Sequence, residues 1–274
     1  MTGEALPECQ SLRLVREGGT LFVFFNRPKA RNALSLQMVG ELEAVLDAVH
    51  ADRSVRVLVL RGEGGHFCAG GDVKDMAAAR SKRFSPGEDD PIAALNRRFG
   101  TLITRLDRAP QTTVAVVEGA AMGGGFGLVC VADVVIALES ASFRLPETGL
   151  GLPPAQIAPF LVRRLGLSRA RRLALTGARL TGEEASLEGL VDILCSGSEE
   201  LEAELLELRR RILRCAPVAS AETKRLLLAC GEVQHDALLD QGAAAFSAAA
   251  RSPEGMEGVI AFIQKKAPSW AEDL

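Results

Sequence analysis

The residue of this chain best suited to proton transfer is Glu147. It follows Pro146 within an apolar, glycine-rich stretch that runs from Phe143 to Pro154. A carboxylate held among apolar residues has a raised pKa, which suits general acid–base catalysis. An ordinary exposed loop glutamate is an equally good explanation of Glu147 taken alone. The three histidines are isolated from one another and tyrosine is absent, so a histidine-based catalytic centre or metal site is hard to assemble and no metal is expected.

Two glycine-rich runs, Gly62–Asp72 and Glu118–Gly127, offer a second kind of chemistry. Each follows an expected strand and precedes an expected helix. Backbone N–H groups at a helix start are unpaired donors, and glycine lets another group approach them closely. The two runs could therefore hold an anion or a developing oxyanion together. Tight turns alone would explain either run taken singly.

Competing interpretations of the glycine runs fail on spacing. Neither run contains G-x-G-x-x-G or the G-K-[ST] ending of a phosphate-binding loop. Cys68 lies inside the first run, but only the adjacent His66 could activate it, so a small residue packed beneath a turn is the better interpretation. No G-x-S-x-G occurs, which argues against a serine hydrolase of the α/β type.

The elements that must position these residues alternate between strand and helix, which indicates an α/β fold. The 274 residues are 47% hydrophobic and 24% charged, the balance of a globular protein, and the net charge of -3 argues against a nucleic-acid partner. Strands are expected at 21–25, 55–60, 113–117, 134–137 and 190–194, and helices at 35–50, 73–80, 92–106 and 123–130. Arg80–Asp90 is expected to be a mobile loop.

After residue 197 only helical patterns follow, at 199–214, 220–230, 233–250 and 253–265. We therefore predict a core of residues 1–197 and a helical section of residues 198–274. The six cysteines form no C-x-x-C and lie mostly among apolar residues, which is typical of reduced thiols. No signal peptide and no apolar run long enough to span a membrane is visible. A cytoplasmic protein without a membrane partner is expected.

Several motifs, in their order and spacing, resemble the enoyl-CoA hydratase/isomerase (crotonase) superfamily over nearly the whole chain. They are Asn26–Leu34, Val57–Gly62, Phe67–Asp72, Gly119–Gly125, Pro146–Glu147, Gly149–Pro153 and Ala261–Lys265. The resemblance implies a crotonase-like spiral of ββα units followed by a helical trimerisation section, in a homotrimer or a dimer of trimers. It also implies an acyl-CoA thioester substrate whose enolate oxygen is stabilised, with no cofactor beyond the coenzyme A of the substrate.

The resemblance also assigns roles to individual residues. The backbone amides of Ala69 and Gly124 match the oxyanion hole, and Glu147 matches the second of two catalytic glutamates. Residues that match the coenzyme A and substrate contacts are Lys29, Ala30, Arg31, Ala33, Gly70, Gly71, Asp72, Val73, Gly123, Phe262 and Lys265. For Lys265 a solvated lysine at a helix end is an alternative.

One position departs from the pattern of typical hydratases, because Gly127 stands where they carry their first glutamate. One carboxylate alone suits a proton shuttle between carbons, as in single-glutamate enoyl-CoA isomerases. Three strings, Phe67–Met76, Gly123–Leu128 and Pro154–Phe160, look like the isohexenylglutaconyl-CoA hydratase branch of acyclic terpene breakdown, which also carries glycine there. A basic residue could clamp the extra carboxylate of that substrate; the candidates are Arg144, Arg163 and Arg164, and a surface role is the alternative for each.

Three hypotheses follow for the reaction. The first is a lyase that adds water to an α,β-unsaturated acyl-CoA, with a branched glutaconyl-CoA as a candidate substrate. The second is an isomerase that moves a double bond with Glu147 alone. The third is a non-catalytic relative that binds acyl-CoA or RNA, supported only by the missing carboxylate at Gly127.

Overall fold

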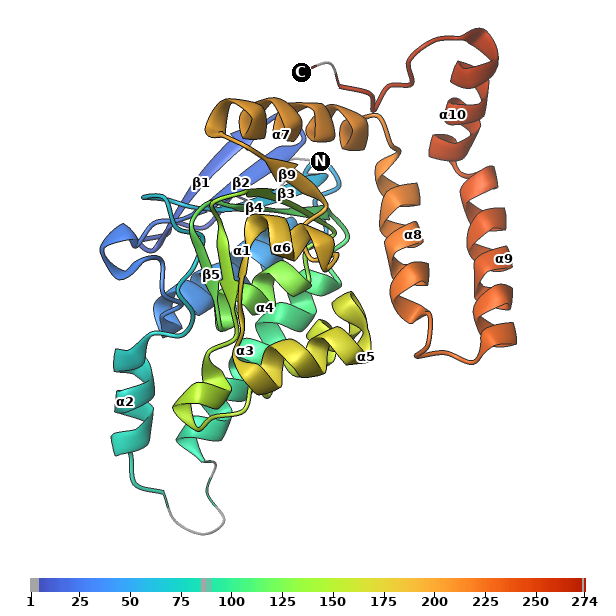
Figure 1. The fold of residues 1–274 in the computed structure, drawn as a ribbon. Coiled ribbons are helices and arrows are strands. Elements are labelled where there is room, and N and C mark those ends of the chain that lie inside the picture. The colour runs from blue at the N-terminus through green and yellow to red at the C-terminus, as the bar shows by residue number, and fades with distance from the viewer. Residues whose placement is uncertain (1–4, 85–87, 89, 273) are drawn as a thin grey trace.

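A sheet of six strands forms the centre of the described part of the chain, with the strands in the order β1-β2-β3-β4-β6-β9 (Figure 1). The computed structural model describes residues 5–84, 88, 90–272 and 274. The strands are β1 (Leu12–Glu17), β2 (Thr20–Phe25), β3 (Val57–Gly62), β4 (Thr112–Val117), β6 (Val134–Leu138) and β9 (Ile193–Cys195). β1 pairs antiparallel with β2, and the remaining pairs are parallel. The predicted α/β alternation is therefore confirmed.

A smaller sheet of three short strands lies between the second glycine run and Glu147. It consists of β5 (Ala120–Met122), β7 (Ser142–Arg144) and β8 (Arg179–Thr181). β5 pairs in parallel with β7, and β7 pairs antiparallel with β8. This sheet matters for the site because β5 lies within the second glycine run and leads to Gly123, and β7 leads into the Glu147 segment.

The helices up to α7 pack around the main sheet, and the last three stand apart from it. They are α1 (Leu36–His50), α2 (Val73–Ser81), α3 (Pro91–Asp107), α4 (Gly124–Cys130), α5 (Ala158–Thr176), α6 (Gly182–Leu187), α7 (Ser198–Leu213), α8 (Pro217–Ala229), α9 (His235–Arg251) and α10 (Pro253–Gln264), with short 3-10 helices η1 (Pro28–Ala30) and η2 (Glu147–Leu150). Part of the predicted loop Arg80–Asp90, namely residues 85–87 and 89, lies outside the described residues.

Both faces of the main sheet are buried, as the apolar run of β3 predicts. Leu58 and Leu60 belong to the larger core, which α1, α3, α4 and α5 complete. Val57 and Val59 point to the other face and join a second cluster with residues of α7. Side chains of successive strand residues point to opposite faces, so β3 is apolar at each position from Val57 to Leu60, where it serves both cores.

Polar caps fix the starts of the helices that lead to the site. The Ser35 hydroxyl accepts a hydrogen bond from the Met38 N–H at 3.2 Å, as the predicted helix start requires. Asp72 caps α2 by accepting from the Lys74 N–H at 2.9 Å. Each cap satisfies an N–H group that has no partner inside its helix, which stabilises the helix by roughly 1 kcal/mol.

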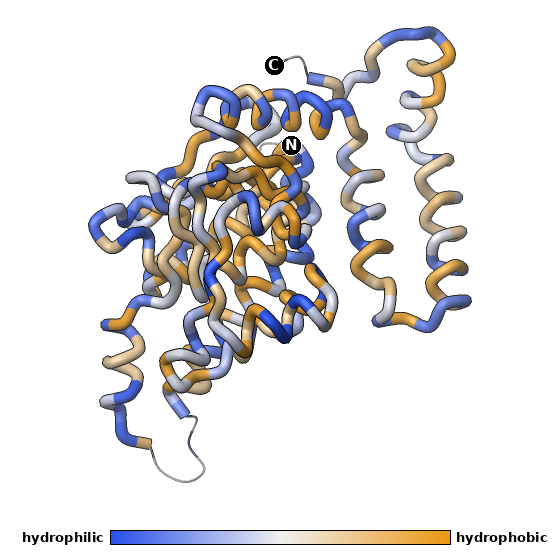
Figure 2. The backbone as a smooth tube through the Cα atoms, viewed as in Figure 1, coloured by the Kyte–Doolittle hydropathy of each residue, from blue (hydrophilic) through white to orange (hydrophobic). Residues whose placement is uncertain are grey.

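The C-terminal helices divide into one that packs on the core and three that stand apart from it (Figure 1). α7 buries Leu201, Leu205 and Leu213 against the sheet. Within α8, α9 and α10 the only buried residue is Ala261, and apolar segments recur along α9 and α10 (Figure 2). Among the exposed apolar side chains are Leu227, Leu239, Phe246, Val259, Ile260, Phe262 and Ile263.

The segment after α10 returns to the core and ties the outer helices to it. Arg56 is nearly buried on the core side, and its guanidinium donates to the Trp270 carbonyl at 2.7 Å and to the Glu272 carboxylate at 2.9 Å. Glu272 also accepts from the Gly19 N–H at 2.9 Å. Within the described residues, no helix has the length and apolar character needed to cross a membrane.

Candidate active site

The first glycine run lies against the turn that follows β2, and backbone hydrogen bonds join the two segments. The Ala69 N–H donates to the Arg31 carbonyl at 3.0 Å, and the Leu34 N–H donates to the Gly70 carbonyl at 2.8 Å. The Asp72 N–H donates to the Leu34 carbonyl at 3.0 Å. These hydrogen bonds fix the backbone conformation of the run at the edge of the site.

The same bonds correct the prediction for Ala69. Its N–H already donates to a carbonyl, so it is not free to stabilise an oxyanion. The Gly70 N–H faces the Cys68 sulfur at 3.5 Å, whereas the N–H of Gly71 has no acceptor among the described residues. Gly71 is also exposed, so it is an available donor beside the part of this run that pairs with the turn after β2. A match of motifs could not distinguish Ala69 from Gly71. The two differ in that a carbonyl of the neighbouring turn, that of Arg31, accepts a hydrogen bond from the Ala69 N–H.

Asn32 holds the turn that supports this run. Its side chain is fully buried. The side-chain oxygen accepts from the Arg27 N–H at 2.9 Å, and the side-chain nitrogen donates to the carbonyls of Glu63 and His66 at 2.8 Å each. Asn32 and Arg31 both have positive φ angles, of 57° and 48°, which asparagine tolerates better than most residues. One side chain therefore joins the turn after β2 to the start of the first glycine run.

The second glycine run meets the first where Gly123 approaches Gly70. A Cβ atom on Gly70 would lie 3.0 Å from the Met122 carbonyl oxygen and 3.7 Å from the Gly123 Cα. Gly70 and Gly123 both have positive φ, 96° and 50°, so glycine is required at this contact. Gly124 begins α4, and its N–H has no acceptor within the described chain. Gly71 and Gly124, whose N–H groups are both free, thus each lie one residue beyond the contact between the runs.

Glu147 lies beside this contact. A Cβ atom on Gly123 would be 2.8 Å from its Oε1, and its Oε2 is buried without a hydrogen-bond partner. Burial raises the pKa of this carboxyl above its ordinary value, while a hydrogen bond from its own backbone N–H opposes the rise. An unpartnered buried carboxyl oxygen next to free N–H donors is the arrangement expected of a group that waits for a substrate or water.

The place of the first hydratase glutamate is filled by apolar side chains. A Cβ atom on Gly127 would lie 3.0 Å from Ile157 Cγ1 and 3.3 Å from Phe99 Cζ. A Cβ atom on Gly124 would lie 2.9 Å from Leu34 Cδ1 and 3.4 Å from the same Phe99 ring atom. Gly127 itself is buried. The site therefore has one carboxylate with an apolar wall opposite, where typical hydratases have two carboxylates.

The residues predicted to contact coenzyme A separate into two groups. Lys29, Ala30 and Arg31 lie exposed on and just after η1, and Ala33 follows them beside the first glycine run. Phe262 and Lys265 lie on α10 and at its end, and α10 is on the opposite side of the molecule from α2 (Figure 1). The Phe262 side chain is 84% exposed. One chain alone does not bring these two groups together.

Asp72 and Val73, at the start of α2, differ in their surroundings. The Asp72 carboxylate accepts from Lys74 and from the Arg27 guanidinium, the latter at 2.7 Å. Burial alone would raise the pKa of Asp72, but these hydrogen bonds outweigh it and hold the pKa below its ordinary value. Asp72 therefore anchors α2 to the turn after β2, whereas Val73 is exposed.

The arginines considered as clamps for a substrate carboxylate are held elsewhere. Arg144 donates to the Gly177 carbonyl at 2.9 Å. Arg163 pairs with Asp107, and Arg164 pairs with Asp192 at 2.7 Å while it also donates to two backbone carbonyls. None of the three is directed at Glu147 by a hydrogen bond in the described structure.

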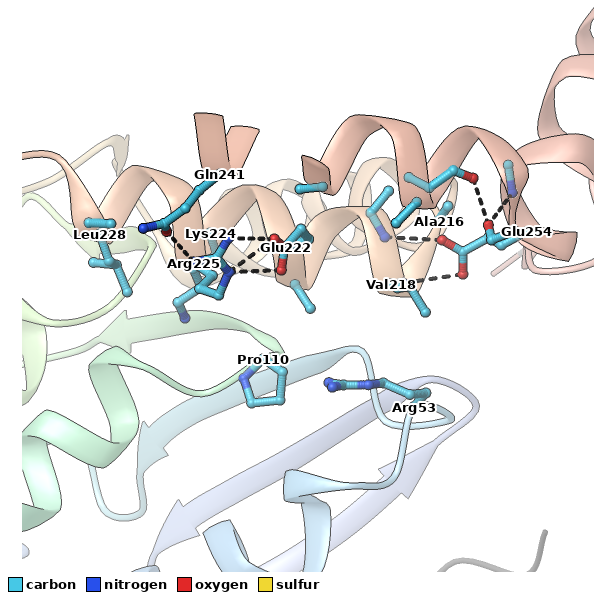
Figure 3. Close-up of a pocket in the computed structure, with 18 of the residues that line it drawn as sticks. Arg53, Pro110, Ala216, Val218, Glu222, Lys224, Arg225, Leu228, Gln241 and Glu254 are labelled. Atoms are coloured by element: carbon cyan, nitrogen blue, oxygen red, sulfur yellow. Dashed lines mark hydrogen bonds and ion pairs between the residues drawn. The ribbon is translucent and has the colours of Figure 1, made fainter. Parts of the chain in front are cut away.

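The buried thiol of Cys68 is unsuited to nucleophilic attack, because burial raises its pKa to about 12. A cleft of about 1010 Å³ lies between the outer helices and the core, bordered by Pro110, Arg53 and α8 (Figure 3). None of Glu147, Gly71 and Gly124 lines it. No group of three or more metal-ligating side chains gathers in the described residues.

Comparisons with known proteins agree with this fold. The sequence pattern of the enoyl-CoA hydratase/isomerase family matches residues 16–273, and the chain belongs to that family. It is 34% identical over 256 residues to the 2,3-dehydroadipyl-CoA hydratase of Escherichia coli strain K12, which spans 93% of this chain and 96% of that protein. The chain is thus an enzyme of the hydratase type, within the lyases.

Solved structures give the fold directly. An enoyl-CoA hydratase/isomerase from Marinobacter aquaeolei superposes with a TM-score of 0.94 at 51% identity and covers 96% of this chain and all, 100%, of that one. Pseudomonas aeruginosa AtuE gives a TM-score of 0.92 at 54% identity, with 96% of this chain and 100% of that chain covered. The predicted crotonase-like fold is confirmed.

Proposed function

We propose that the enzyme adds water across the double bond of an α,β-unsaturated acyl-CoA, with Glu147 as the general acid–base. The N–H groups of Gly71 and Gly124 stabilise the thioester enolate oxygen. The observation that carries this proposal is the buried, unpartnered Oε2 of Glu147 beside Gly123. Oriented N–H donors of this kind each lower the barrier by roughly 3 kcal/mol, and a general acid contributes roughly a factor of 100 to 10,000 in rate.

The proposed substrate is a branched glutaconyl-CoA such as isohexenylglutaconyl-CoA. Two observations support a dicarboxylic acyl group. The motifs around Gly71, Gly127 and Ile157 resemble the branch that acts on this thioester, and the relative in Escherichia coli is named for a dehydroadipyl thioester. Apolar side chains, those of Phe99 and Ile157, lie against Gly127, and an alkyl branch would contact such a surface favourably.

We further propose that the active molecule is a homotrimer or a dimer of trimers, built through α8, α9 and α10. These helices expose many apolar side chains, including Phe246 at 77%, and exposed apolar surface of this extent marks a contact between proteins. In such an assembly Phe262 and Lys265 would reach the coenzyme A site of a neighbouring copy. Phe246→Glu should shift the sedimentation coefficient to that of the monomer, whereas Leu187→Glu on α6 should leave it unchanged. A trimer that persists in Phe246→Glu would contradict the proposed interface.

A second candidate reaction is the shift of a double bond by Glu147 alone, which the apolar wall at Gly127 favours. A panel of 2-enoyl and 3-enoyl thioesters separates the two reactions. Hydration removes the enoyl absorbance, whereas isomerisation of a 3-enoyl thioester in deuterium oxide places deuterium on carbon without adding water. Binding without turnover of any thioester would indicate a non-catalytic protein.

Glu147→Gln tests the catalytic residue for both reactions. We expect turnover to fall by about 100-fold or more, while Glu183→Gln, an exposed glutamate on α6, retains full activity. A Glu147→Gln variant with undiminished turnover would refute the role of Glu147.

A further inference from the structure

Hydration of a double bond requires two proton transfers at different atoms. Water gives up a proton as its oxygen bonds to the β-carbon, and the α-carbon receives a proton. A glutamic acid that protonates the α-carbon begins the reaction protonated, so it cannot accept the proton of the attacking water at the same time. A single carboxylate that starts ionised can serve both atoms only in sequence, by taking the water proton and then delivering it to the α-carbon. If Glu147 instead starts protonated, a second acid–base group is needed on the side of the β-carbon.

Among the described residues, the neighbours of Gly124 and Gly127 do not provide that group. The side chains against Gly124 and Gly127 are those of Leu34, Phe99 and Ile157, at 2.9 to 3.3 Å from the positions that a Cβ atom would take. The amide of Gln156, next to Ile157, is engaged with Asn96 at 3.0 Å, and a neutral amide is not a proton acceptor at physiological pH. The site is thus complete for one proton transfer and lacks a base for the other.

We propose that the substrate carries the second acid–base group itself, as a carboxylate joined through one methylene to the β-carbon. This inference rests on the proposed hydratase function. The required substrate class is a 3-substituted glutaconyl thioester. In it the attacking water oxygen, the β-carbon, the methylene, the carboxyl carbon and a carboxylate oxygen close a six-membered ring with the proton in transfer, so the base is held beside the water by covalent bonds.

The step balances with one water consumed. The water oxygen bonds to the β-carbon, its proton passes to the substrate carboxylate, and the electrons of the double bond move to the thioester oxygen beside Gly71 and Gly124. The enolate then takes the proton of Glu147 at the α-carbon. Glu147 recovers a proton from the substrate carboxylic acid through solvent, which returns both groups to their starting states.

The surroundings keep such a carboxylate basic. A guanidinium paired with it would stabilise its charge and lower its proton affinity, yet Arg144, Arg163 and Arg164 are all held by other partners. An apolar wall disfavours the charged form and raises proton affinity. The same wall that excludes a protein carboxylate thereby favours proton transfer to a substrate carboxylate.

Three thioesters with the same 3-alkyl group test this inference: the glutaconyl acid, its ω-amide and its ω-methyl ester. We expect kcat for the acid to exceed kcat for the isosteric amide by about 100-fold or more, while KM changes less. The kcat of the acid should fall at low pH as the substrate carboxylate is protonated, and the amide should lack that limb. A carboxylate that merely aids binding would change KM instead.

A pair of variants gives an independent test. Gly127→Glu combined with Ile157→Ala restores a protein carboxylate and makes room for it. We expect this double variant to raise kcat on the amide by about tenfold or more, and Ile157→Ala alone not to do so; thermal melting confirms that both are folded.

The outcomes distinguish this inference from the proposed function. Equal kcat for acid, amide and ester would overturn the role of the substrate carboxylate and leave the hydratase in place. Hydration of no thioester, or double-bond migration without hydration, would overturn both.

Discussion

Replacement of Asn32 by alanine should destabilise the fold and weaken catalysis together, although Asn32 does not touch the substrate. The side chain is fully buried and makes three hydrogen bonds, to the Arg27 N–H and to the Glu63 and His66 carbonyls. Its loss leaves three partly buried backbone groups without the Asn32 side chain as a partner. At about 1 kcal/mol for each bond, the free energy of unfolding should fall by about 3 kcal/mol.

The backbone adds a further cost. Asn32 has a φ of 57°, and alanine is less stable than asparagine in this region by roughly 1 kcal/mol. The total expected loss is therefore about 4 kcal/mol, a large part of the stability of a typical domain. Asn32→Asp keeps the acceptor for Arg27 but places a carboxylate oxygen against two carbonyls. It should be at least as destabilising at neutral pH and less so in acid, where the protonated carboxyl can donate.

Urea denaturation at one fixed protein concentration measures this loss, because any coupling of folding to assembly makes stability depend on concentration. The kcat/KM of the folded variant should also fall, because the Arg31 carbonyl that accepts from Ala69 belongs to the same turn. A free energy of unfolding within 1 kcal/mol of the parent would refute the assigned role of the Asn32 bonds.

Three further predictions follow from the site and its support. The pKa of Glu147 is raised by burial, so the contribution of this group to stability is present below the ordinary glutamate pKa and is lost as pH rises through the pKa of the folded state. Glu147→Gln should therefore be more stable than the parent at pH 7 but not at pH 3. An equal difference in stability at both pH values would contradict this. Gly70→Ala should lower kcat/KM more than tenfold, because its Cβ would lie 3.0 Å from the Met122 carbonyl oxygen. Gly65→Ala also has a positive φ but no neighbour within 4 Å, so its effect should be much smaller. Similar activity in the two variants would refute the importance of the contact at Gly70. Glu272→Ala leaves the Arg56 guanidinium without its carboxylate partner. It should lower the free energy of unfolding, measured by chemical denaturation, by about 2 kcal/mol. Glu207→Ala removes an exposed pair with Arg211 and should cost less than about 0.5 kcal/mol. Equal losses would argue that the C-terminal segment is not held to the core by Glu272.

Local pattern predicted the large elements well, because their signals are strong. Ser35 marked the start of α1, and the uninterrupted apolar run of β3 indicated a strand buried on both faces. The long helix α5 was missed, as were β1, an edge strand with charged residues among its apolar ones, and the small sheet of β5, β7 and β8. Strands of three residues are too short to show a period, and their pairing depends on partners up to about forty residues away in the chain.

The site was predicted in outline and corrected in detail. The importance of Glu147 and the two glycine runs follows from residue type and order. The choice between Ala69 and Gly71 depends on which N–H the Arg31 carbonyl takes, and this register contact leaves no local trace in the sequence. The apolar wall at Gly127 likewise comes from Phe99 and Ile157, which lie about thirty residues away on either side.

The return of the C-terminal tail to the core also sets an order of events during synthesis. The Glu272 carboxylate joins Gly19 across 253 positions and Arg56 across 216. Contacts of such long range form only once nearly the whole chain is available. While the chain emerges from the ribosome, the sheet and α7 can form first, with the Arg56 guanidinium still hydrated. Lys224 of α8 can then pair with Asp133 at 2.7 Å, and the contacts that Glu272 makes with Gly19 and Arg56 are completed last.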